Sequence, residues 1–114
     1  TIFDDVKDDF TIMKEEPFGP LVPMLSFKNF DEVIERANKN DLGLCSYICT
    51  NSMDQAHRAS ELMETGTVAV NTGVVALAEA PFGGIKQTGY GREGGSTAIK
   101  DYLNIKYTHL GLKG

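Results

Sequence analysis

The carboxylate whose neighbours best suit it to recognise a ligand is Glu16, in the run Lys14-Glu15-Glu16-Pro17-Phe18-Gly19-Pro20. Prolines restrict the backbone torsions around it, and an aromatic ring and a glycine complete a short rigid turn. A carboxylate held in this way can accept hydrogen bonds from the paired hydroxyls of a ligand. The alternative is a solvated charge at a turn, which local chemistry alone favours because most glutamates are exposed.

The other reactive side chains lack the partners that catalysis needs. Cys45 and Cys49 lie four residues apart, with no second cysteine pair and no histidine pair at metal-ligand spacing, so neither zinc nor a disulfide framework is indicated. Both are expected within a strand, whereas a nucleophilic cysteine needs a helix N-terminus, a cation or a general base. His57 and His109 have no serine or aspartate arrangement nearby. We assign no catalytic residue and no metal ligand.

One run has the residue spacing of a dinucleotide-binding fingerprint but lacks the surrounding elements that such a fingerprint needs. The run Gly89-Tyr90-Gly91-Arg92-Glu93-Gly94 matches the spacing of glycines that cradle a pyrophosphate. That loop must follow a hydrophobic strand, open a crossover helix and precede an acidic residue about twenty positions on. Here the polar residues 86–88 precede it and the sequence ends too soon. The passage is therefore expected to be a structural loop.

Composition excludes some classes of partner. The formal net charge is −5 and no run of basic residues occurs, which argues against nucleic-acid binding. No apolar run approaches the roughly 20 residues that span a bilayer, and the first residues are too acidic for a secretory signal, so a cytosolic protein without membrane contact is expected. With 41% hydrophobic and 24% charged residues the chain should fold. A start at Thr1 suggests a trimmed product or a fragment.

Alternating hydrophobic periods predict an α/β fold. Strands are expected at residues 21–27, 44–50 and 67–71. The first helix between them should begin at the cap Asn29 and the second at the cap Ser52, running to about Glu64. The order β-α-β-α-β predicts right-handed crossovers and a parallel βαβαβ sheet unit.

After residue 71 the regular alternation of strand and helix patterns ends. A glycine-rich passage at residues 80–95 leads to a short helix that Ser96 should cap. A terminal extended strand is then expected from Asn104 to Leu110, with Ile105, Tyr107 and His109 on one face. Without a neighbouring strand in the sequence, this is an exposed edge that another segment or subunit would pair with.

Several motifs in order resemble the aldehyde dehydrogenase superfamily. The runs that carry the resemblance are Glu15-Glu16-Pro17-Phe18-Gly19-Pro20, Asn38 with Gly43-Leu44, Gly66-Thr67-Val68-Ala69-Val70-Asn71, Pro81-Phe82-Gly83-Gly84-Ile85-Lys86-Gln87-Thr88-Gly89 and Gly91-Arg92-Glu93. They cover essentially the whole chain and match the last part of a family protein several times longer. The resemblance implies residues 1–103 as the C-terminal part of a catalytic domain and 104–114 as an oligomerisation strand and tail.

The resemblance also implies roles for individual side chains. Glu16 would hydrogen-bond the nicotinamide-ribose hydroxyls of NAD or NADP, and Phe18 would pack near the nicotinamide. Phe82 matches an aromatic of the aldehyde pocket, and the loop from Asn71 through Ala76 matches the region that shapes substrate entry. Homo-oligomers would form through residues 104–110, which pack with a hairpin from the N-terminal part of the family fold.

The resemblance implies an NAD(P)-dependent oxidation of an aldehyde to a carboxylate, by attack of a cysteine thiolate, hydride transfer and hydrolysis with a glutamate as general base. Neither residue lies in this sequence, so we expect the chain to be inactive alone. The glycine-rich passage and the ending are most similar to succinate-semialdehyde dehydrogenases. That subgroup often has a serine for the substrate carboxylate where this chain has Ala76.

Two alternatives remain from other classes. One is a non-catalytic interaction module that pairs with full-length subunits through its terminal strand. The other is a small nucleotide-binding domain, for which the fingerprint context is wrong.

Overall fold

Both predicted helices begin at the predicted caps. In the computed structural model, which describes residues 1–112, the Asn29 side chain accepts a hydrogen bond from the Glu32 N–H at 2.9 Å, and helix α2 follows at Phe30–Asn38. The Ser52 hydroxyl accepts from the Gln55 N–H at 3.3 Å, and helix α3 follows at Met53–Leu62. These caps satisfy N–H groups that the first turn of a helix leaves unpaired, which confirms both predicted helix starts.

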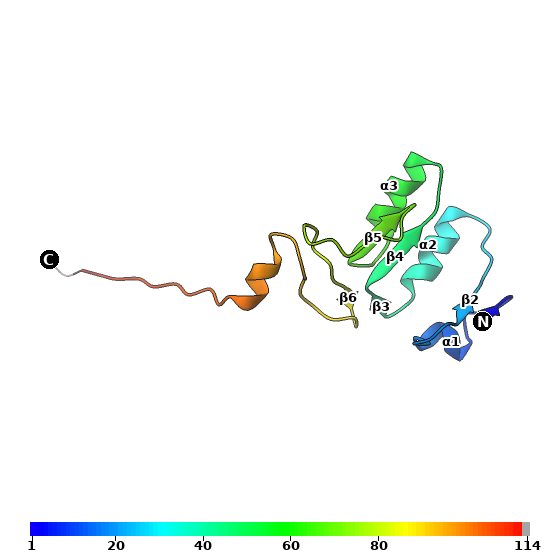
Figure 1. Ribbon diagram of the computed structural model, residues 1–114, viewed down its shortest axis with the longest axis horizontal. Helices are drawn as coiled ribbons and strands as arrows, with labels where there is room; N and C mark the ends of the chain where they lie inside the picture. Colours follow the sequence, from blue (N-terminus) through cyan, green and yellow to red (C-terminus); the bar gives the residue numbers. More distant parts are fainter. Residues whose placement is uncertain (113–114) are drawn as a thin grey trace.

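One parallel βαβ unit forms as predicted. Strand β4 (Cys45–Ile48) pairs in parallel with β5 (Thr67–Val70), with Cys45 opposite Thr67 and Ile48 opposite Val70, and α3 connects them. The Arg58 guanidinium of α3 lies 4.6 Å from the centre of the Phe30 ring in α2. The two helices therefore meet side by side next to this pair of strands (Figure 1).

The first predicted strand does not join that sheet. The strand expected at residues 21–27 shortens to β2 (Val22–Pro23), which pairs in parallel with β1 (Ile2–Phe3). The Val22 N–H donates to Thr1 O at 2.9 Å and the Met24 N–H to Phe3 O at 2.8 Å, so Pro23 lies between two donors and no ladder bond is lost to its missing N–H. The continuous three-stranded βαβαβ sheet was a wrong prediction, because the N-terminal residues supply a nearer partner.

A third strand pair attaches the glycine-rich passage to the α/β body, which consists of α2, α3, β4 and β5. Strand β3 (Leu42–Gly43) pairs antiparallel with β6 (Ile85–Lys86). Lys86 has a left-handed backbone with φ of 57°, and its ammonium contacts Glu64 Oε2 at 2.6 Å and Asn38 O at 2.7 Å. Backbone strain at a non-glycine residue persists where surrounding contacts fix it, as these two do.

The C-terminal residues 98–110 form a short helix and an extended segment outside the α/β body. A short helix η1 (Ala98–Tyr102) is of the 3₁₀ type, preceded by Thr97 with no capping side chain, so the predicted cap at Ser96 was wrong. The Asp101 carboxylate instead accepts from the Arg92 N–H at 2.8 Å and ties this helix to the glycine-rich loop. Residues 104–110 extend away as a single chain (Figure 1), and no β-ladder includes them in the described part. The predicted tail ends at residues 113–114, which lie outside the described residues.

The chain exposes far more surface than its size requires. Its accessible surface is 9394 Å², whereas a compact protein of this mass exposes about 6,100 Å². The radius of gyration is 19.4 Å, against about 13 Å for a compact chain of this length. Only Val6, Ala59 and Ala69 form a buried apolar core among the described residues. Much apolar surface is therefore left for another polypeptide segment to cover. No described helix has the length and apolarity to cross a membrane.

Candidate cofactor and aldehyde site

The turn that carries Glu16 is closed by short backbone hydrogen bonds. It follows the short helix α1 (Thr11–Lys14), and the Glu15 N–H donates back to Thr11 O at 2.9 Å. The Gly19 N–H donates to Pro17 O at 2.6 Å and the Leu21 N–H to Gly19 O at 2.8 Å. These are two successive three-residue turns, which leave the backbone little freedom. The expected turn is therefore present, and its rigidity remains a prediction.

Both candidate cofactor residues of this turn point outward. The Glu16 side chain is exposed and hydrogen-bonds to no other residue of the described chain. Phe18 is 98% exposed, which is unusual for an aromatic side chain. A free carboxylate acceptor and a bare aromatic face fit a sugar with paired hydroxyls next to an aromatic heterocycle.

Glu16 borders an open cleft of about 510 Å³. The opposite walls come from the end of α2, from β3 and β4, and from Met63, Thr65 and Thr88. Glu16 is the acidic residue of this lining, which otherwise consists of apolar and neutral polar side chains. The segment with Glu16 and the α/β body thus face each other across the cleft.

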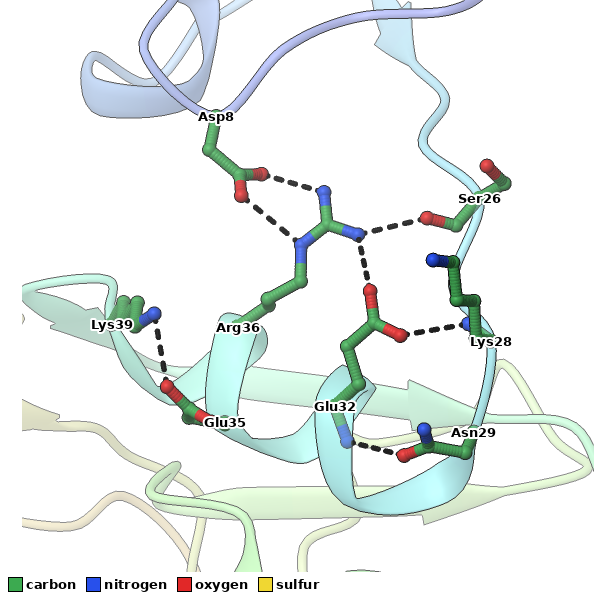
Figure 2. Close-up of polar contacts among 8 residues, drawn as sticks. All are labelled: Asp8, Ser26, Lys28, Asn29, Glu32, Glu35, Arg36 and Lys39. Carbon is green, nitrogen blue, oxygen red and sulfur yellow. Dashed lines mark hydrogen bonds and ion pairs between the residues drawn. The ribbon is translucent and has the colours of Figure 1, made fainter.

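Arg36 of α2 connects that segment to the body (Figure 2). Its Nε donates to Asp8 Oδ2 at 3.1 Å and its Nη2 to Asp8 Oδ1 at 2.7 Å, while Nη1 donates to Ser26 O at 2.8 Å. Glu32, one turn earlier, lies 3.6 Å from Nη1. The hydrogen bonds from Arg36 lower the pKa of the Asp8 carboxyl below its ordinary value, because they favour the charged form of the carboxylate.

The loop with Phe82 is a folded structural element. The Phe82 N–H donates to Glu93 O at 2.7 Å, and the Glu93 N–H returns a bond to Phe82 O at 2.8 Å. Arg92 Nη1 donates to Gly84 O at 2.8 Å. The loop lines a second open pocket, of about 330 Å³, to which Phe82 and Tyr90 contribute. The run Gly89 to Gly94 lies in the loop between the two-residue strand β6 and the 3₁₀ helix η1 and opens no crossover helix, which agrees with the structural interpretation.

The two hollows adjoin, because Leu44 and Thr88 line both. Glu16 borders one and Phe82 the other, so the structure brings one predicted cofactor residue and one predicted aldehyde residue to neighbouring surfaces. Phe18 lines neither hollow. Ala76 is exposed in the loop after β5 and lines neither of them.

Asn71 begins the loop that leads to Ala76. It has a left-handed backbone with φ of 54°. Its side chain donates to Thr50 O at 2.8 Å and accepts from the Thr50 N–H at 2.9 Å. Asn71 therefore fastens the ends of β4 and β5 to each other and sets where the loop departs.

The cysteines have no activating partner in the described part of the chain. Cys45 is partly exposed and its thiol donates only to the carbonyl of Ser46, at 3.8 Å. Hydrogen bonding to Cys45 raises the pKa of Tyr47, as expected for side chains on one face of the strand. Cys49 is exposed, with no hydrogen bond to any residue that the structure describes.

Sequence reasoning did not single out Asp8, Arg36 or the Lys86–Glu64 ion pair. The one local signal was Glu32, four residues before Arg36, which is the spacing of a helical ion pair. No sequence pattern joins Asp8 to Arg36, 28 positions later.

Comparison with known proteins decides the family. The model of the aldehyde dehydrogenase family matches residues 1–108. The chain belongs to the aldehyde dehydrogenase family. Mitochondrial succinate-semialdehyde dehydrogenase of Arabidopsis thaliana is 45% identical over 111 residues, and succinate-semialdehyde dehydrogenase [NADP(+)] GabD of Escherichia coli (strain K12) is 45% identical over 112 residues. These alignments cover 97% and 98% of the chain, but 21% and 23% of the relatives, so the chain spans about a fifth of their length.

Two further matches show another named substrate and a bound cofactor among the relatives. Retinaldehyde dehydrogenase 3 of Rattus norvegicus is 47% identical over 106 residues, which are 93% of this chain and 21% of that protein. The NAD+ complex of an aldehyde dehydrogenase from Bacillus cereus superposes with a TM-score of 0.89 at 46% identity, over 92% of this chain and 21% of that one. The fold and the family are thus shared with enzymes that use NAD+ or NADP+, and the aldehyde varies among relatives of similar identity.

Proposed function

We propose that this chain supplies the nicotinamide-ribose contact and part of the aldehyde pocket of an NAD(P)-dependent aldehyde dehydrogenase. The single observation that carries the proposal is the turn with Glu16 and Phe18, in which the exposed Glu16 carboxylate borders a cleft and the Phe18 ring is 98% exposed beside it. A carboxylate without a partner in its own chain gains most from hydroxyl donors on a ligand. The cofactor, when bound, accepts the hydride of the family reaction.

The proposed substrate is succinate semialdehyde or a similar small aldehyde. Phe82 would form an apolar wall for the carbon chain, next to the cofactor cleft. The succinate-semialdehyde dehydrogenases among the relatives support this choice. Ala76 argues for a difference in how the carboxylate end is held, because a methyl group cannot donate a hydrogen bond to it.

The chain alone is proposed to be inactive, because it has no activated nucleophile. Cys45 and Cys49 have no general base or cation beside them among the described residues. The large uncovered apolar surface supports assembly with the rest of the family fold, whether in the same polypeptide or in another. A cytosolic location remains a prediction.

A second candidate function rests on the tail. Residues 104–110 are extended and unpaired in the described chain, with Ile105 and Tyr107 highly exposed. An extended edge of this kind adds readily to a sheet of another subunit. A non-catalytic module that joins full-length subunits, or a homo-oligomer held by this strand, would use the same surface.

The test is a graft, in which this chain replaces the matching stretch of the E. coli GabD relative. The proposal expects the graft enzyme to fold, to bind NADP+ and to form NADPH from succinate semialdehyde. The chain by itself, with its mass verified, should form none. A folded graft that does not bind NADP+ would refute the proposed site. An insoluble graft would count against it as well, because the proposal requires these residues to complete the family fold. NADPH formation by the isolated chain would mean that Cys45 or Cys49 is a nucleophile.

A further inference from the structure

The segment with Glu16 has few attachments to the rest of the molecule. Residues 1–25 are closed on themselves by the β1–β2 pair, by the bond from Val6 N–H to Met24 O at 3.3 Å and by the burial of Val6. Between residues 1–25 and residues 26–112, the structure contains one polar contact, the bidentate pair of Asp8 with Arg36. Among the polar contacts of the described residues, that pair alone therefore holds this segment in position over the cleft.

Hydrogen-bonded turns transmit the position of Asp8 to Glu16. The Phe10 N–H donates to Lys7 O, the Met13 N–H to Phe10 O and the Glu15 N–H to Thr11 O, at 3.1, 3.0 and 2.9 Å. These overlapping turns run from one side of Asp8 to the residue before Glu16. A displacement of the Asp8 carboxylate would consequently move the Glu16 turn as well.

Arg36 is itself held in place on the body. Its Nη1 donates to Ser26 O at 2.8 Å and also lies 3.6 Å from Glu32 Oε1 (Figure 2). The Glu32 carboxylate is fixed in turn, because its Oε2 accepts from the Lys28 N–H at 2.9 Å. The guanidinium thus presents its planar fork to Asp8 from a fixed direction, which a flexible ammonium could not do.

We propose that Arg36 is a positioning residue for cofactor binding, which acts through Asp8 to hold Glu16 at the distance from the body that the nicotinamide ribose requires. This inference rests on the proposed function of Glu16. Arg36 itself lines neither of the two hollows. The role of Arg36 differs from general support of the fold, because its effect on cofactor binding should shrink when the charged Glu16 carboxylate is replaced by a weaker, neutral acceptor.

The experiment is a double-mutant cycle in the graft enzyme, with the Kd for NADP+ measured by fluorescence titration. Arg36→Gln should raise Kd about three- to tenfold in the presence of Glu16, and by less than about twofold in the Glu16→Gln background, because coupled residues are not additive. The matched control is Glu35→Gln, which removes the exposed pair of Glu35 with Lys39 at 3.0 Å on the same helix (Figure 2) and should leave Kd unchanged.

The outcomes separate this inference from the proposed function. If Glu16→Gln leaves Kd unchanged, the role of Glu16 fails and the role of Arg36 falls with it. If Glu16→Gln weakens binding but Arg36→Gln does not, only the positioning role is refuted. Equal effects of Arg36→Gln in both backgrounds would also refute it, because they indicate a general effect on the fold. Hydrogen exchange of residues 8–25 supplies a readout that does not depend on the cofactor, and Arg36→Gln should accelerate it while Glu35→Gln should not.

Discussion

Gly66 is the position where one methyl group should most disturb the substrate side of the site. A Cβ at Gly66 would overlap the carbonyl oxygen of Gly83 and lie 2.8 Å from its carbonyl carbon and 2.9 Å from Gly84 Cα. All three atoms are backbone, so no side-chain rotation relieves the overlap. Because carbon atoms pack at about 3.5–4.0 Å, the Gly83–Gly84 backbone must retreat by on the order of 1 Å. Gly66→Ala should therefore loosen the loop that carries Phe82.

The magnitude follows from the type of strain. Gly66 is not among the glycines with a left-handed backbone, so alanine adds no torsional penalty and the cost is steric. Overpacking of this kind costs about 1–3 kcal/mol. A value of about 2 kcal/mol corresponds to roughly 30-fold faster local opening. The amides to follow are those of Phe82 and Glu93, which bond to each other across the loop.

The assay is hydrogen exchange on the graft enzyme, with Gly73→Ala as the matched control. A Cβ at Gly73 meets no atom within 4 Å, and alanine there should be neutral or stabilise by about 0.4–1 kcal/mol through the unfolded chain. Gly66→Ala should also raise the KM for the aldehyde while leaving the Kd for NADP+ unchanged, because Glu16 lies on a separate segment. Unchanged exchange at Phe82 and Glu93 in Gly66→Ala, or equal acceleration in both variants, would show that close packing against Gly66 does not hold the Phe82 loop.

Three further substitutions test other parts of the site. Glu16→Gln should reduce kcat/KM by about tenfold with little change in melting temperature, because it removes a charged acceptor from an exposed turn; normal turnover would remove the case for this residue. Ala76→Ser should raise kcat/KM for succinate semialdehyde by about tenfold but not for butanal, since only succinate semialdehyde has a carboxylate for the hydroxyl to bond; equal changes for both aldehydes would show that residue 76 does not contact the substrate carboxylate. Asn71→Ala should destabilise the β4–β5 ends by about 1–2 kcal/mol, seen as faster exchange of the Thr50 amide, because two hydrogen bonds are lost; unchanged exchange would show that the Asn71 clamp contributes nothing.

Local chemistry determined what could be predicted well. The caps Asn29 and Ser52 act within three residues of their partners, so the helix starts could be predicted without knowing the fold. The uncharged β-branched run at residues 67–70 likewise became a strand in parallel with the preceding one. The Glu16 turn is also local, because Pro17 and Pro20 fix their own φ angles and its hydrogen bonds join residues only two positions apart.

Short-range patterns were enough to predict the α/β character, the starts of α2 and α3, the Glu16 turn and the motifs that resemble the family. The tertiary structure alone decided that β2 pairs with β1, that Thr97 rather than Ser96 precedes a 3₁₀ helix, and that Arg36 meets Asp8. Those features join residues distant in the chain or depend on competing partners. Strand pairing and ion pairs of that kind leave no periodicity in a sequence, because their energy comes from neighbours that only folding brings together.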